Sequence, residues 1–147
     1  NAWLEPRFTA DVDLTVGAGV AELDHLSAVL AAAGLERVTI HGAALPSGPD
    51  FVRFASADRS LLIEVQAAKT DLQHEVIRRA VRVGDGPAIA TVEDLLVLKL
   101  IANRPKDRGD LVGLAALPGI DWAYVERWAA EWGFGAALAH LRSDRPG

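Results

Sequence analysis

The sequence predicts a mixed α/β fold, with strands and helices in the first part of the chain and helices alone in the second. Stretches that alternate polar and apolar residues, the pattern of half-buried strands, occur early in the chain. From about residue 91 onward, apolar residues recur at helical spacing instead. We therefore expect a mixed sheet flanked by helices at residues 1–90, followed by a helical C-terminal part at residues 91–147 that packs on this core.

The elements of the first part follow from periodicity and from residues that break it. Residues 11–16 alternate with period two, and Gly17 and Gly19 end that strand. A helix is expected over residues 20–33, with Gly34 as its C-terminal cap. Further strands are expected at residues 37–41, 51–55 and 60–65, the last two joined by a polar turn at 56–59.

The later elements have clear start and stop signals. Thr70 and Gln73 form a capping box for a helix that runs to about residue 80. Thr91 begins a helix that reaches Ala102, and Pro105 prevents its continuation. The remaining expected elements are a short strand at 81–83, a turn at 84–87, and helices at 107–117, 121–132 and 135–141.

Composition sets broad limits on function. The chain has 147 residues, half of them hydrophobic, which is enough for a core, and a net charge of −5, which argues against a broad surface for binding nucleic acid. It has no cysteine, no apolar run long enough to span a membrane and no signal-like leader, so we expect a cytoplasmic protein without a membrane partner. It also has no methionine and opens at Asn1, so we expect a fragment or processed chain.

Two aspartates in the first strand are the strongest candidates for chemistry. Residues two apart on a strand share a face, so Asp11 and Asp13 lie side by side, opposite an apolar face of Val12, Leu14 and Val16 that is expected to meet the core. Paired carboxylates repel each other, and a divalent cation such as magnesium removes that repulsion. The alternative is a strand end whose acidic residues simply face solvent.

Glu64 is the candidate for a third carboxylate. It interrupts the apolar stretch 60–65, and if that strand lies beside the first, it completes a site with Asp11 and Asp13. The alternative is an edge strand with Glu64 exposed at its end.

Two segments resemble a known superfamily. Residues 7–14, Arg-Phe-Thr-Ala-Asp-Val-Asp-Leu, are similar to the Arg-x-Thr-x-Asp-x-Asp motif of small bacterial nucleotidyltransferases of the DNA polymerase β-like superfamily. Residues 98–102 and 104–111, which include Lys99 and Arg-Pro-Lys-Asp-Arg-Gly-Asp-Leu, resemble the late Lys-Asp segment of its AbiEii-type branch. Members of that branch occur as toxins of type IV toxin–antitoxin systems.

The resemblance implies a magnesium-dependent transferase with two metal ions, for which manganese is a substitute. Asp11 and Asp13 would bridge both ions, and Glu64 would hold the ion nearer the acceptor hydroxyl. Arg7, Thr9, Lys99, Lys106 and Asp107 are the implied substrate and phosphate-binding residues. The substrate would be a nucleoside triphosphate. The acceptor would be the 3′ end of a tRNA, a protein hydroxyl or a small molecule such as an aminoglycoside, and a cognate antitoxin or toxin protein would be a partner.

The sequence also departs from the superfamily pattern. The Gly-Gly or Gly-Ser turn that holds the triphosphate would lie upstream of Arg7 and does not occur in the chain, and the third carboxylate is Glu rather than the usual Asp. We therefore expect this chain by itself to be a poor catalyst. The alternative is a non-catalytic, antitoxin-like binding module with the same fold.

Basic residues elsewhere have simpler interpretations. Arg78, Arg79 and Arg82 are expected to form a solvated helix face. The cluster around Lys99 and Lys106 has a structural alternative, ion pairs between neighbouring turns of a helix surface.

Overall fold

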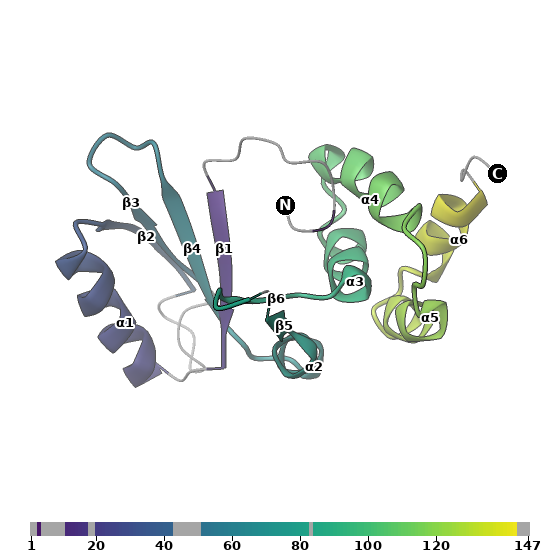
Figure 1. Cartoon of the computed structure of the whole chain (residues 1–147), viewed down its shortest axis with the longest axis horizontal. Coiled ribbons are helices and arrows are strands. Elements are labelled where there is room, and N and C mark those ends of the chain that lie inside the picture. Colours follow the sequence, from purple (N-terminus) through teal and green to yellow (C-terminus); the bar gives the residue numbers. More distant parts are fainter. Residues whose placement is uncertain (1–2, 4–10, 18–19, 43–50, 83, 144–147) are drawn as a thin grey trace. The chain divides into compact units, whose positions relative to one another are not determined.

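The computed structural model describes residues 3, 11–17, 20–42, 51–82 and 84–143, with the backbone alone for residues 20–22. Its contacts divide the chain into two compact units, Phe8–Arg78 and Asn1–Arg7 with Arg79–Gly147, which we call the sheet unit and the helical unit (Figure 1). The predicted mixed α/β class is confirmed. The predicted domain boundary at residue 90 stays a prediction; the two units divide at Arg78 and Arg79.

The sheet unit is built on four strands in the order β1-β4-β3-β2. They are β1 (Asp11–Val16), β2 (Glu36–His41), β3 (Phe51–Ala55) and β4 (Leu62–Ala67), with α1 (Val20–Ala32) between β1 and β2 and α2 (Asp71–Arg79) after β4. β1 runs parallel to β4, whereas β3 is antiparallel to both β4 and β2. The expectation that the two acidic strands are neighbours is confirmed, although the second begins at Leu62 rather than Ser60.

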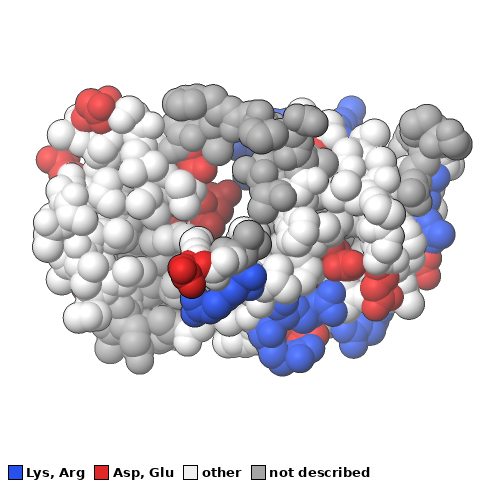
Figure 2. All heavy atoms as spheres, viewed as in Figure 1, with Lys and Arg blue, Asp and Glu red and all other residues white. Residues whose placement is uncertain are grey.

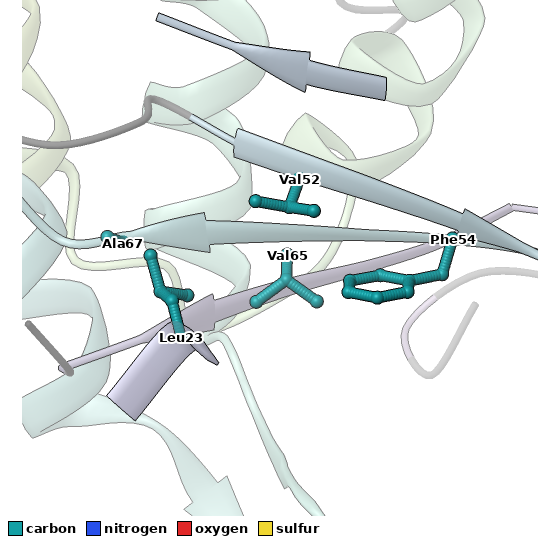
Figure 3. Close-up of a cluster of buried hydrophobic side chains, with 5 residues drawn as sticks. All are labelled: Leu23, Val52, Phe54, Val65 and Ala67. Atoms are coloured by element: carbon teal, nitrogen blue, oxygen red, sulfur yellow. The ribbon is translucent and has the colours of Figure 1, made fainter. Parts of the chain in front are cut away.

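One face of this sheet carries the core of the unit. Strand alternation places Val52 and Phe54 of β3 and Val65 and Ala67 of β4 on the same side, where they pack with Leu23 of α1 (Figure 3). Phe54 and Val65 are almost completely buried. The opposite side carries Arg53 of β3 and Glu64 and Gln66 of β4, together with the apolar Phe51, Ala55 and Leu62.

The apolar side of β1 is only partly buried, contrary to expectation. Val16 packs against the core cluster, but Val12 and Leu14 remain 40% and 36% exposed. β1 is the outermost strand next to β4, whereas α1 packs beside β2 at the other end of the sheet (Figure 1). Helix α1 therefore shields the β1 side of this face less.

Two sequence signals at helix ends are confirmed. Gly34 adopts φ +86° directly after α1, and the Leu35 amide donates to the Leu30 carbonyl at 3.0 Å, closing the last turn. At the start of α2, the Gln73 amide donates to the Thr70 hydroxyl at 3.2 Å, while the Thr70 amide donates to the Gln73 side chain at 3.0 Å. This reciprocal pair is the capping box that the sequence predicts.

The helical unit contains a small two-stranded sheet followed by helices. Its elements are β5 (Val81–Arg82), β6 (Ala88–Ile89), α3 (Val92–Ala102), the 3₁₀ turn η1 (Pro105–Asp107), α4 (Arg108–Ala115), α5 (Trp122–Glu131) and α6 (Gly135–Ser143). Helix α3 packs against α4 and α5, and α6 packs against the same two helices. Leu96, Leu114 and Val125 are buried at these contacts. Asn103, in the left-handed region, ends α3 before Pro105, as the sequence predicts.

Candidate functional site

Asp11, Asp13 and Glu64 lie on one face of the sheet, the face opposite the core. Asp11 and Asp13 come from β1, and the register of the parallel β1–β4 pair sets Asp13 beside Glu64. Side chains of such cross-strand partners are neighbours on the same face. Asp11 and Asp13 are exposed, and Glu64 is about one-third exposed. The structure therefore brings the three predicted carboxylates together on a surface that solvent reaches.

Arg53 of β3 joins this face, and the sequence did not predict it. It is the register partner of Glu64 on the side away from β1, so Asp13, Glu64 and Arg53 form a row across three strands. The Arg53 Nη2 donates to Glu64 Oε2 at 2.6 Å. This hydrogen bond and the charge of Glu64 raise the pKa of Arg53 above its usual value, and the charges of Asp11 and Asp13 act in the same direction. Arg53 thus lies within the field of all three carboxylates.

The chemistry of this face suits a hard divalent cation. Magnesium prefers carboxylate oxygens and fills its remaining positions with water and substrate phosphates. Within the described residues, however, no group of three or more His, Cys, Asp or Glu side chains is arranged to hold a metal ion. Glu64 is ion-paired with Arg53, so its carboxylate is engaged elsewhere. Carboxylate oxygens are suitable ligands for magnesium. Glu64 could bind the metal only after its ion pair with Arg53 is broken.

The predicted phosphate-binding residues Lys99 and Asp107 lie in the helical unit and contact each other. Lys99 Nζ of α3 is 3.1 Å from Asp107 Oδ1 and 2.7 Å from Asp110 Oδ2, and Arg104 Nε is 2.6 Å from Asp107 Oδ2. Both aspartates are buried. The contacts of Lys99 join α3 to η1 and α4, so this is an internal cluster rather than a row of pairs along one helix surface. A role in phosphate binding stays a prediction.

The other predicted residues are placed differently. Arg7 and Thr9 lie outside the described residues. Lys106 is exposed on η1, next to the buried Asp107. The predicted residues thus fall on two units, with Asp11, Asp13 and Glu64 in one and Lys99, Lys106 and Asp107 in the other.

Asp107 should make the helical unit sensitive to acid. Burial alone would raise the pKa of Asp107, but the hydrogen bonds and charges of Arg104 and Lys99 outweigh it and lower the pKa below 3.8. A lowered pKa means that the charged form stabilises the folded state above about pH 4, and that this stabilisation is lost as the pH falls through the folded-state pKa. Asp107→Asn should therefore lower the free energy of unfolding by about 2 kcal/mol at pH 7, with a smaller difference at acid pH.

Urea unfolding at pH 7 and in acid, followed by tryptophan fluorescence, measures this effect. If the free energies of unfolding of wild type and Asp107→Asn differed by the same amount at both pH values, the prediction would be wrong. The probe is selective, because Trp3, Trp122, Trp128 and Trp132 are the four tryptophans of the chain and all belong to the helical unit.

A second buried charge network in the helical unit was missed by sequence reasoning. Asp94 of α3 is fully buried and accepts hydrogen bonds from the Tyr124 hydroxyl at 2.5 Å and the Thr91 hydroxyl at 2.7 Å. Arg79 Nε lies 3.5 Å from Asp94, Arg79 Nη2 lies 3.3 Å from Glu93, and the guanidinium carbon is 3.9 Å from the centre of the Tyr124 ring. The expectation that Arg79 belongs to a solvated face is wrong, since Arg79 pairs with α3 and stacks on α5.

Charge and apolar character also bear on partners. On the face shown in Figure 2, the largest groups of basic side chains lie over α2 and over β5 and β6, with acidic side chains beside them, and basic side chains do not cover the face as one continuous surface. This agrees with the net charge of −5. In the part of the chain that the structure describes, no helix has the length and apolar character needed to cross a membrane.

Comparison of the chain with protein families and with curated proteins finds no match.

Proposed function

We propose that this chain is the core of a magnesium-dependent nucleotidyltransferase. The observation that carries the proposal is the row of carboxylates, with Asp11 and Asp13 on β1 and Glu64 beside Asp13 on the parallel strand β4. Like charges on neighbouring strands destabilise a sheet, so placing three acidic side chains close together on the face opposite the core carries a cost in stability. A function that needs negative charge at this position explains the pattern.

The chain's residues have distinct roles in this proposal. Asp11 and Asp13 would be the shared ligands of the metal ions, and Glu64 would hold the ion nearer the acceptor hydroxyl. Magnesium, when bound, would make the attacking hydroxyl easier to deprotonate and would stabilise the negative charge that develops on the leaving pyrophosphate. The protein's own task is to position the carboxylates, and a sheet does this well because the backbone of both strands is fixed by hydrogen bonds.

The substrate class follows from the same reasoning and from the resemblance noted above. A nucleoside triphosphate supplies the phosphates that complete magnesium coordination. An acceptor hydroxyl attacks the α-phosphate, the bond to the β-phosphate oxygen breaks, and pyrophosphate leaves. A tRNA 3′ end is the first acceptor to test, with protein and small-molecule hydroxyls next, and a toxin–antitoxin context fits the AbiEii-type resemblance. Lys99 and Lys106 are proposed to contact phosphate.

One observation favours a second candidate, a non-catalytic or antitoxin-like binding module with the same fold. Glu64 is ion-paired with Arg53, and Lys99 is ion-paired with Asp107 and Asp110. In a domain that had lost catalysis, such charged residues would pair with each other within the protein instead of contacting a metal or a substrate. Metal-dependent nucleotide binding separates the two candidates.

The test is a titration of the chain with each nucleoside triphosphate, in magnesium and in EDTA, by isothermal titration calorimetry. We expect at least one nucleotide to bind about tenfold or more tightly with magnesium, because the metal bridges the phosphates to the carboxylates. Transfer is then assayed with that nucleotide, labelled on its α-phosphate, and bulk tRNA. Equal affinity with and without magnesium for all four nucleotides would favour the non-catalytic module.

A further inference from the structure

The sheet face that carries Asp11, Asp13 and Glu64, which we call the acidic face, also carries a cationic side chain, Arg53. Arg53 is connected to Glu64 through a 2.6 Å contact, and Glu64 is flanked by Asp13 on the other side. Three carboxylates and one guanidinium leave this set of four groups with two negative charges. Arg53 therefore compensates part of the repulsion that a divalent cation would otherwise compensate.

The Arg53–Glu64 pair can exchange. The side chains are 42% and 32% exposed, and ion pairs exposed to this degree contribute little to stability. Arginine also has a long side chain that can move to another rotamer without moving the strand. A divalent cation attracts the three carboxylates more strongly than a single guanidinium does, since its charge is twice as large.

We propose that Arg53 is a built-in counter-cation that holds Glu64 in the metal-free protein and releases it to a divalent cation. The inference rests on the proposed function for the identity of the cation. It assigns Arg53 as a positioning residue that tunes metal affinity: the guanidinium lowers affinity by occupying Glu64 and by repelling the metal. When no metal is present, the guanidinium also reduces the repulsion among the carboxylates of the acidic face.

Manganese binding, measured by the electron paramagnetic resonance signal of free Mn²⁺, tests this without any activity assay. Wild type, Arg53→Gln, Arg53→Lys, Glu64→Gln and the Arg53→Gln/Glu64→Gln double variant are titrated with MnCl₂ at one ionic strength. We expect Arg53→Gln to bind Mn²⁺ about tenfold more tightly than wild type, because a competing positive charge is removed. Arg53→Lys keeps the charge and should stay within about threefold of wild type.

The double variant distinguishes the proposed role from a general change of charge. If Arg53 acts by occupying Glu64, its substitution should change Mn²⁺ affinity less than about threefold when Glu64 is already Gln. An unreduced tenfold effect in the Glu64→Gln background would overturn the claim that Arg53 acts through Glu64. Far-UV circular dichroism confirms that each variant is folded.

A measurement on wild type covers the case in which Arg53→Gln does not fold. In protein labelled with ¹⁵N-arginine, the Arg53 Nε–H resonance, assigned by its loss in Arg53→Lys, should shift as MgCl₂ is added. A resonance that stays in place up to saturating magnesium overturns the proposal.

The outcomes separate this inference from the proposed function. Equal Mn²⁺ affinity of wild type and Arg53→Gln overturns the role of Arg53 and leaves nucleotidyl transfer intact. Tighter binding by Arg53→Gln together with absence of magnesium-dependent nucleotide binding supports the role of Arg53 and overturns the proposed function. Absence of Mn²⁺ binding in every protein overturns the role of Arg53, and the nucleotide titration in magnesium and in EDTA then decides the proposed function.

Discussion

Replacing Asp13 by Asn should abolish magnesium-dependent nucleotide binding, and transfer with it, while the sheet unit stays folded. Asp13 has Asp11 two positions before it on its own strand and Glu64 beside it on β4. Asn has nearly the same shape but no charge, so the metal loses a ligand and half of the charge that β1 contributes. A comparable loss of one charge-stabilising group in other enzymes costs on the order of 100-fold or more in rate. Asp11→Asn should behave alike.

The fold should tolerate this change, because Asp13 is exposed and its loss relieves repulsion with Asp11 and Glu64. The measurement combines nucleotide titration in magnesium with far-UV circular dichroism and thermal unfolding. Asp24→Asn is the matched control, since Asp24 is an exposed aspartate on α1, on the other side of the sheet. An Asp13→Asn protein that binds nucleotide with wild-type magnesium dependence would rule out the proposed metal site.

The sequence predicted the acidic strands well because their signals are local. The period-two alternation of residues 11–16 defined β1, and the Thr70–Gln73 capping box defined the start of α2. The prediction that Glu64 lies near Asp11 and Asp13 required only that the two strands be neighbours with these residues on the same face. The caps and the alternation depend on residues a few positions apart, which is the range over which sequence patterns are informative.

The partner of Glu64 was not predictable, because it depends on the register of a hairpin. If β4 had begun at Ser60, directly after a four-residue turn, Arg53 would have paired with Leu62. The observed strand begins at Leu62 and pairs with Ala55, which places Arg53 opposite Glu64. A register shift of two keeps the faces but changes every partner.

The later start of β4, at Leu62 instead of Ser60, has a local cause in the loop before it. The Ser56 and Ser60 hydroxyls both donate to Asp58 at 2.6 and 2.8 Å, and the Leu61 amide donates to the Ser56 hydroxyl at 3.1 Å. The hydrogen bonds from the Ser56 hydroxyl, the Ser60 amide and the Ser60 hydroxyl lower the pKa of Asp58 to about 2. Side-chain hydrogen bonds of this kind extend a loop by competing with the strand ladder.

The role of Arg79 was missed for a related reason. Its partners Glu93, Asp94 and Tyr124 lie 14, 15 and 45 positions later, on α3 and α5. A basic residue at the end of a polar helix has the same local pattern whether it faces solvent or another helix. Tertiary contact decides between the two, and helical periodicity does not contain that information.

Removing the carboxylate of Asp94 should destabilise the helical unit more than any surface substitution. Asp94 is fully buried and is the shared acceptor of the Tyr124 and Thr91 hydroxyls, with Arg79 Nε 3.5 Å away. Asp94→Ala leaves both hydroxyls without their acceptor and removes one of the two carboxylates beside Arg79, which keeps only Glu93 at 3.3 Å. Breaking a buried charged pair by removing one partner costs about 3–5 kcal/mol, so we expect a decrease of that size in the free energy of unfolding.

Two further variants apportion the effect. Tyr124→Phe removes one hydrogen bond and should cost about 1–2 kcal/mol, because the acceptor is charged. In the Asp94→Ala background the same change should cost much less, since the hydroxyl has already lost its acceptor; this coupling is the sign of a direct interaction. Asp85→Ala, at an exposed turn of the same unit, is the control and should change stability by less than about 0.5 kcal/mol.

Tryptophan fluorescence during urea unfolding measures these differences in the helical unit alone, because the sheet unit contains no tryptophan. The buried Trp128 packs edge-on against Tyr124 at 6.4 Å between ring centres, so its emission reports the region around the network. Loss of less than about 1 kcal/mol in Asp94→Ala would mean that water reaches Tyr124 and Arg79 once the carboxylate is gone. The network would then contribute little to the stability of the helical unit, and the prediction would be wrong.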